Sequence, residues 1–136
     1  MELQFFGATE RVTGSMYLLR AGSHTLLLEC GLVQGSDEEE ERNRQAFPFE
    51  IGDIDALVLS HSHIDHSGRI PRLVREGYAG PIYTHKASRD LCRIMLPDSG
   101  YLNEKDADWK NKKRAAKNLP RIEPLYTQAD AEACIE

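Results

Sequence analysis

Four side chains able to bind a metal ion stand within six consecutive positions, and this cluster constrains the chain more than any other feature. They are His61, His63, Asp65 and His66. Imidazole nitrogens and carboxylate oxygens are ligands that divalent ions such as zinc accept in proteins. Because three of the 5 histidines of the chain fall in this stretch, ordinary loop polarity explains it poorly. The segment is predicted to be a metal site.

The residues before the cluster predict how it is held. Residues 56–60 form a short, mostly apolar run, typical of a buried strand with the ligands at its carboxyl end. Side chains two positions apart on an extended chain point the same way, so His61 and His63 are predicted to share one ion. Asp65 and His66 follow at a turn and are predicted to face a second ion. One ion shared by all four is the alternative.

A helix is predicted over residues 67–77, directly after the ligands. Ser67 is a candidate N-cap, Pro71 suits the first helical turn, and Gly77 suits the end of a helix. The amino end of this helix would lie beside the metal site. Its partial positive charge would then favour an anionic substrate.

The ligand pattern resembles the His-x-His-x-Asp-His signature of the metallo-β-lactamase superfamily. Residues 26–32 are similar to the strand and turn that carry the family's first motif, with Glu29 where the family usually has Asp. The resemblance to the superfamily's β-CASP branch, which contains RNA-processing nucleases, covers essentially the whole chain. It extends through residues 67–71, 95–99, 103–107 and 123–127.

This resemblance implies an α/β fold, the αββα sandwich, which is built from two similar halves. The chain resembles only the first half, so residues 1–136 are expected to be the amino-terminal part of such a domain. The family completes a site for two zinc ions with a further His, a bridging Asp and a last His, all from downstream segments. We therefore expect weak zinc binding by this chain, an uncovered apolar surface, and a homodimer or domain swap.

The resemblance also implies a function, the cleavage of RNA by a zinc-activated hydroxide. Asp65 and His66 would be the catalytic residues, and Glu29 would orient a metal ligand by contacting it without binding the metal itself. Two alternatives stay open. A dinuclear zinc hydroxide also attacks carbonyl groups, so the parent protein could be a thioesterase or lactamase. The chain alone could instead be an inert fragment that binds metal weakly.

A basic stretch follows Trp109 and is a candidate contact surface for RNA phosphates. A solvated helix face is its alternative explanation. Residues 1–60 hold 11 acidic and 4 basic side chains, whereas residues 61–136 hold 11 acidic and 13 basic, so anion binding is expected in the second half. The candidate contacts are Lys110, Lys112, Lys113, Arg114 and Lys117.

The acidic run over residues 37–41 fits a helix start, because Ser36 and Glu39 have the spacing of a capping box. Repulsion of nucleic acid is the alternative role for this run. The three cysteines, Cys30, Cys92 and Cys134, are widely spaced and are predicted to be buried free thiols. No apolar run is long enough to span a membrane, and the first residues do not resemble a signal peptide, so a cytoplasmic location is expected.

The order of elements predicts a layered α/β fold. Strands are expected over residues 3–6, 15–20, 25–29, 56–60 and 81–84. Helices are expected over residues 37–45, 67–77, 86–96, 103–117 and 128–136, with a charged linking segment after residue 96.

Overall fold

A five-stranded mixed sheet forms one side of the computed structural model, which describes residues 1–135. The strands lie in the order of the chain, antiparallel from β1 to β3 and parallel from β3 to β5. Their bounds are β1 Glu2–Phe5, β2 Tyr17–Ala21, β3 His24–Leu28, β4 Ala56–Leu59 and β5 Ile82–Thr84. All five predicted strands are present, with ends shifted by one or two residues.

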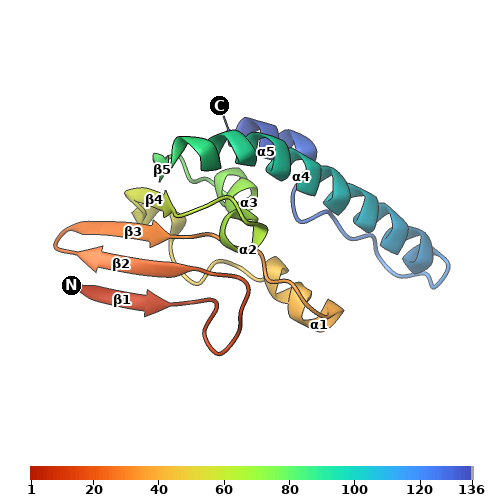
Figure 1. Cartoon of the computed structure of the whole chain (residues 1–136). Helices are drawn as coiled ribbons and strands as arrows, with labels where there is room; N and C mark the ends of the chain where they lie inside the picture. The colour runs from red at the N-terminus through yellow and green to blue at the C-terminus, as the bar shows by residue number, and fades with distance from the viewer. Residues whose placement is uncertain (136) are drawn as a thin grey trace.

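Helices gather beside β4 and β5, and the long helix α4 passes over this end of the sheet (Figure 1). Helix α5 contacts both α3 and α4. No helix among residues 1–135 is long and apolar enough to cross a membrane. The helical bounds are α1 Asp37–Glu40, α2 Ile64–Ser67, α3 Ile70–Arg75, α4 Lys86–Ala115 and α5 Gln128–Ala133, with 3-10 turns η1 Glu41–Arg44 and η2 Ile51–Asp53.

The two faces of the sheet differ in how they are covered. On one face, Leu18, Leu27, Leu57 and Ile82 are aligned as cross-strand neighbours, and the three leucines are completely or almost completely buried. On the other face, a second row of cross-strand neighbours is exposed at both ends, where Phe5 and Tyr83 each have 60% of their surface accessible to solvent. The intervening neighbours are Tyr17, Leu28 and Val58. One face of the sheet therefore holds the core, and the other carries an uncovered apolar row.

The prediction of two helices with a link after residue 96 was wrong, because α4 is continuous from Lys86 to Ala115 with Pro97 inside it. A proline inside a helix removes one hydrogen bond and normally favours a break. Packing along the helix outweighs this cost. Leu96 is 2% exposed, and Gly100 approaches the backbone of Thr127 so closely that a Cβ would lie 2.6 Å from its carbonyl oxygen.

Other predicted helix boundaries were partly right. The capping box of Ser36 and Glu39 is present, but the α-helix stops at Glu40 and continues as the 3-10 turn η1. Ser67 does not cap α3. It is the last residue of α2, is fully buried, and donates its hydroxyl to the carbonyls of Ser62 and His63 at 2.8 and 3.0 Å. The predicted helix over 128–136 is confirmed as far as Ala133, and Glu136 lies outside the described residues.

Candidate metal centre

The four predicted ligands follow β4 directly. The backbone leaves the sheet at Leu59 and passes without regular secondary structure to His63, which precedes the first turn of α2. Asp65 and His66 lie on that short helix. The strand therefore positions the first two ligands, and the turn of α2 positions the other two.

The structure brings the three imidazole rings of this segment together. The ring centroid of His61 lies 4.6 Å from that of His63 and 4.1 Å from that of His66. The carboxylate Oδ2 of Asp65 lies 3.5 Å from Nε2 of His66. The rings of His61 and His63 lie close together, and their sharing of one ion stays a prediction. The division into two pairs, each on its own ion, stays a prediction.

Hydrogen bonds orient two of the rings. The hydroxyl of Ser60 lies 2.8 Å from Nδ1 of His61, and Oε2 of Glu29 lies 3.3 Å from Nδ1 of His66. Glu29 is itself held, because its Oε1 accepts a hydrogen bond from the backbone N–H of Ser60 at 3.0 Å. Contacts of this kind fix the orientation of a histidine ligand and leave its Nε2 atom for the metal.

Glu29 reaches this position through an unusual backbone conformation. Its φ is +62°, a left-handed value that few residues other than glycine adopt, at the point where the chain leaves β3. The side chain is 9% exposed and turns toward the ligand loop. The longer carboxylate of Glu29, compared with the Asp usual in the family, thus still contacts a predicted metal ligand.

The backbone of the ligand loop is fastened by neighbouring segments. The N–H of Ser15 donates to the carbonyl of Asp65 at 2.9 Å, and the N–H of Cys30 donates to the carbonyl of His66 at 2.8 Å. A third bond runs from the N–H of Leu32 to the carbonyl of Ile64 at 2.9 Å. These bonds hold α2 in place although a four-residue helix has little stability of its own.

The donor set fits zinc in chemical kind, since it combines imidazole and carboxylate groups. Its arrangement does not close a site within this chain. Among residues 1–135, no group of three or more His, Cys, Asp or Glu side chains is placed to hold a metal ion. His85 does not join the cluster but caps α4, with its Nδ1 accepting a hydrogen bond from the N–H of Ala87.

The three cysteines take no part in the cluster. All three are free thiols, as predicted. Cys30 and Cys92 are buried, as predicted, whereas Cys134 is only partly buried. Burial raises the pKa of Cys30 to about 12, which keeps it protonated and unreactive at neutral pH.

The predicted RNA-contact residues lie on the last turns of α4 and just beyond it. Lys110 pairs with Asp106 at 2.8 Å, the ammonium of Lys113 lies 3.4 Å from the ring centroid of Trp109, and Nε of Arg114 donates to the carbonyl of Pro120. Trp109 is 55% exposed. The structure thus gathers the basic side chains on one helix end, where part of their charge is compensated.

Two residues near the site were not predicted from the sequence. Ser60 contacts His61 and Glu29, and its place between the strand and the first histidine was a usable signal. Arg69 is 6% exposed, and its Nε donates to the carbonyl of Gly31 at 2.8 Å, whereas its backbone N–H bonds to the carbonyl of Cys30. Nothing in the local pattern distinguishes Arg69 from a surface arginine.

Replacing Glu29 by Gln is expected to weaken zinc binding by about ten- to a hundredfold, the usual cost of losing a partner of a histidine ligand. The amide keeps the size of the side chain but removes the charge that faces His66. Zinc titration calorimetry of the wild-type and variant full-length proteins measures this change. Glu38→Gln, at an exposed position, is the matched control, and equal zinc affinity in all three proteins would show that Glu29 has no role.

Replacing Gly31 by Ala is expected to unfold the ligand loop, because the new Cβ would lie 1.7 Å from the carbonyl oxygen of Asp65. Real Cβ atoms do not approach so closely, so the loop must move or the fold must open. We expect a loss of about 2 kcal/mol or more in unfolding free energy, measured by urea denaturation. Gly52→Ala is the control, since its Cβ would meet no atom within 4 Å. Equal stability of the two variants would contradict the close contact.

Comparison with known proteins agrees with this geometry. The family model described as "Metallo-beta-lactamase superfamily" matches residues 9–124. Ribonuclease TTHA0252 of Thermus thermophilus is 48% identical over 99 residues, which cover 73% of this chain and 22% of the relative. The transcription termination factor FttA of Methanocaldococcus jannaschii is 29% identical over 136 residues, 100% of this chain and 19% of the relative.

A further relative is Integrator complex subunit 11 of Danio rerio, 30% identical over 97 residues, which are 68% of this chain and 16% of that protein. The chain thus spans about a fifth of the length of the curated relatives that it matches. The resemblance to the superfamily and to its β-CASP branch, stated from the sequence, is confirmed, and so is the α/β fold class. The chain belongs to the metallo-beta-lactamase superfamily.

Proposed function

We propose that the chain is part of a metal-dependent hydrolase that cleaves RNA. The observation that carries the proposal is the cluster of His61, His63 and His66 beside Asp65 at the end of β4. The family match supports metal-dependent hydrolysis, and the relative named a ribonuclease supports RNA as the substrate. A cytoplasmic location is part of this proposal.

Each residue of the cluster has a role in this proposal. His61 and His63 would hold one zinc ion, and Asp65 and His66 the other. Two zinc ions supply, when bound, a hydroxide at neutral pH and neutralise charge on the phosphate. Asp65 accepts a hydrogen bond from the attacking water and so orients it, while Glu29 and Ser60 keep the rings of His66 and His61 aligned. Asp65 and His66 are thus the proposed catalytic residues.

We propose further that residues 1–136 are the amino-terminal part of a larger metallo-β-lactamase-like domain. Two observations support this. The relatives extend well beyond the matched region, and one face of the sheet carries an uncovered apolar row that ends in Phe5 and Tyr83. A second half of the domain would cover this row, and in its absence a second copy of the chain would do so. The isolated chain is therefore expected to form a dimer or a domain swap.

The end of α4 is the proposed contact for the RNA strand outside the cluster. Its lysines and arginine would meet phosphates, and the exposed ring of Trp109 would stack on a base. These residues are Lys110, Lys112, Lys113, Arg114 and Lys117. The partial compensation by Asp106 argues for a weak and salt-dependent contact.

The test is a hydrolysis assay on the full-length protein that contains residues 1–136. Single-stranded RNA should be cleaved in the presence of zinc, and cleavage should stop after chelation and return when zinc is restored. The 136-residue chain alone should show no turnover, because it supplies about two ligands per ion where a catalytic zinc needs about three. Turnover of a thioester or a β-lactam without cleavage of RNA would contradict the proposed substrate class.

A further inference from the structure

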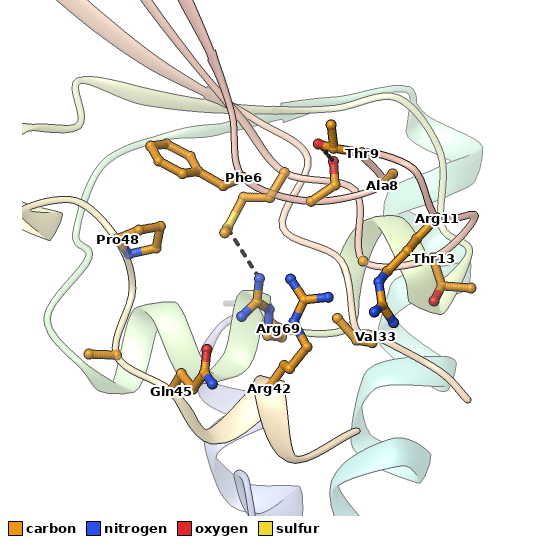
Figure 2. A pocket seen from close by; sticks show the side chains of 14 residues that line it. Phe6, Ala8, Thr9, Arg11, Thr13, Val33, Arg42, Gln45, Pro48 and Arg69 are labelled. Atoms are coloured by element: carbon orange, nitrogen blue, oxygen red, sulfur yellow. Dashed lines mark hydrogen bonds between the residues drawn. The ribbon is translucent and has the colours of Figure 1, made fainter. Parts of the chain in front are cut away.

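A hollow of about 200 Å³ lies between the loop of residues 7–14 and the segment of residues 42–48, and none of the four predicted metal ligands lines it (Figure 2). The loop joins β1 to β2, and the segment follows α1. Three of the lining side chains are arginines, Arg11, Arg42 and Arg69, and none of the lining residues is acidic. Such a composition concentrates positive charge in an enclosed place.

Arg69 forms the floor of the hollow and is the most unusual of the three. Only 6% of its surface is exposed, and its guanidinium lies 5.3 Å from the ring centroid of Phe47. Its Nε donates to the carbonyl of Gly31, whereas an Nη2 hydrogen points to the sulfur of Met16 at 3.3 Å, a weak acceptor. A guanidinium has five N–H donors, so Arg69 keeps donors without a strong partner on the side of the hollow.

The charge of Arg69 has no counter-ion in the part of the chain that the structure describes. Neither Arg69 nor Arg42 forms an ion pair with a carboxylate of residues 1–135. Burial lowers the pKa of Arg69, and the positive charges of Arg72 and Arg42 act in the same direction, whereas the carboxylate of Glu76 acts against them. The guanidinium groups of Arg42 and Arg69 lie next to each other in Figure 2, where like charges repel.

The neighbouring arginines differ from this pair because their charges are matched. Arg11 contacts Glu39 at 2.5 Å, and Arg72 contacts Glu76 at 2.6 Å. The arginines of the hollow without an ion pair to a carboxylate of residues 1–135 are therefore Arg42 and Arg69, and Arg42 also borders a second hollow lined by Asp37, Glu38, Glu39 and Glu41. Two adjacent guanidiniums, one of them buried, are the arrangement that a doubly charged anion stabilises, because each planar group can donate two parallel hydrogen bonds to it.

We infer that this hollow is a binding site for a phosphate group, held between Arg42 and Arg69. The wall of the hollow is tied to the ligand loop, since Gly14 precedes Ser15, whose N–H donates to the carbonyl of Asp65. The site is nevertheless separate from the metal ligands and needs no metal. It goes beyond the proposed RNA cleavage and does not depend on it.

Inorganic phosphate is the first probe, titrated into the ¹⁵N-labelled 136-residue chain without metal and at ionic strength held constant with chloride. We expect saturable shifts of the backbone signals of residues 7–14, of Val33 and of Gln45, and of the Nε–H signal of Arg69. A nucleoside 5′-monophosphate is the second probe. Tighter binding of it than of phosphate would assign the site to a phosphate ester, and equal binding would assign it to the free anion.

Arg42→Gln is the informative variant because Arg42 is exposed and its side chain forms no hydrogen bond or ion pair with residues 1–135. It should weaken phosphate binding about tenfold or more, as expected for the loss of charge-assisted hydrogen bonds. Arg20→Gln is the matched control, with the same change of charge on β2 and only a 3.8 Å surface pair to Glu2 to lose. It should bind phosphate like the wild type.

Three results would overturn the inference. They are shifts that do not saturate, shifts of the same size when chloride replaces phosphate, and equal weakening by Arg42→Gln and Arg20→Gln. Arg69→Gln alone is not decisive, because the loss of its bond to Gly31 could unfold the chain. Since the experiment contains neither RNA nor metal, its failure would leave the proposed RNA cleavage untouched.

Discussion

Replacing Asp65 by Asn in the full-length protein is expected to lower kcat/KM for RNA cleavage by about a thousandfold. The expected effect exceeds the ten- to hundredfold cost of losing an outer partner, because Asp65 is proposed to contact both the metal and the attacking water. The amide keeps the shape of the side chain but carries no negative charge. One of its two polar atoms is an NH2 group, which cannot accept a hydrogen bond from the water as a carboxylate oxygen does. Its neighbour His66, whose Nε2 lies 3.5 Å from Oδ2 of Asp65, would lose the same negative charge.

The measurement is a comparison of initial cleavage rates at saturating zinc, together with the zinc content of each protein. Asp53→Asn is the matched control. Asp53 lies at an exposed position of η2, and its substitution changes the charge by the same amount. The control should retain full activity. A variant at position 65 that cleaves RNA within a fewfold of the wild-type rate would remove Asp65 from the proposed mechanism.

Replacing Leu57 by Ala is expected to lower the free energy of unfolding by about 3 kcal/mol, within the range for buried leucines. Leu57 is fully buried in the central part of the sheet, between Leu27 on β3 and Ile82 on β5. Truncation removes apolar contacts on both sides and leaves a cavity that the surrounding strands can fill only in part. Because β4 carries the ligand loop at its carboxyl end, the loss should also loosen the histidine cluster.

Urea denaturation followed by circular dichroism measures this change. Val58→Ala, one position along the same strand, is the control, because Val58 lies on the exposed row and keeps 37% of its surface. It should cost less than about 1 kcal/mol, since surface substitutions rarely cost more. Equal losses for the two variants would mean that the two faces of the sheet are covered alike, against the burial of the leucine row.

The strands and the ligand motif could be read from the sequence because both depend on neighbours along the chain. Alternating or continuous apolar residues mark a strand, and a histidine spacing of two places both rings on one side of an extended segment. The capping box at Ser36 is local in the same sense, since both of its hydrogen bonds join residues three positions apart. The strands and the capping box were predicted correctly, with small errors at the ends of elements, whereas metal binding by the histidine motif stays a prediction.

Contacts between distant residues decided the rest. Helix α4 runs through Pro97 because its buried side chains and Gly100 pack against other parts of the chain, which no local propensity records. Ser67 became a buried residue of α2 because the carbonyls of Ser62 and His63 accept its hydroxyl. The partnership of Glu29 with His66 and the convergence of Arg42 with Arg69 likewise arise only when the folded backbone brings separate segments together.

The sequence by itself thus determined which side chains are candidate metal ligands and which strand precedes them, since these follow from residue type and spacing. The tertiary structure alone decided how those side chains are supported and where uncompensated charge collects. The physical reason is that hydrogen bonding and side-chain alternation act over a few residues, whereas burial and charge pairing depend on the whole fold.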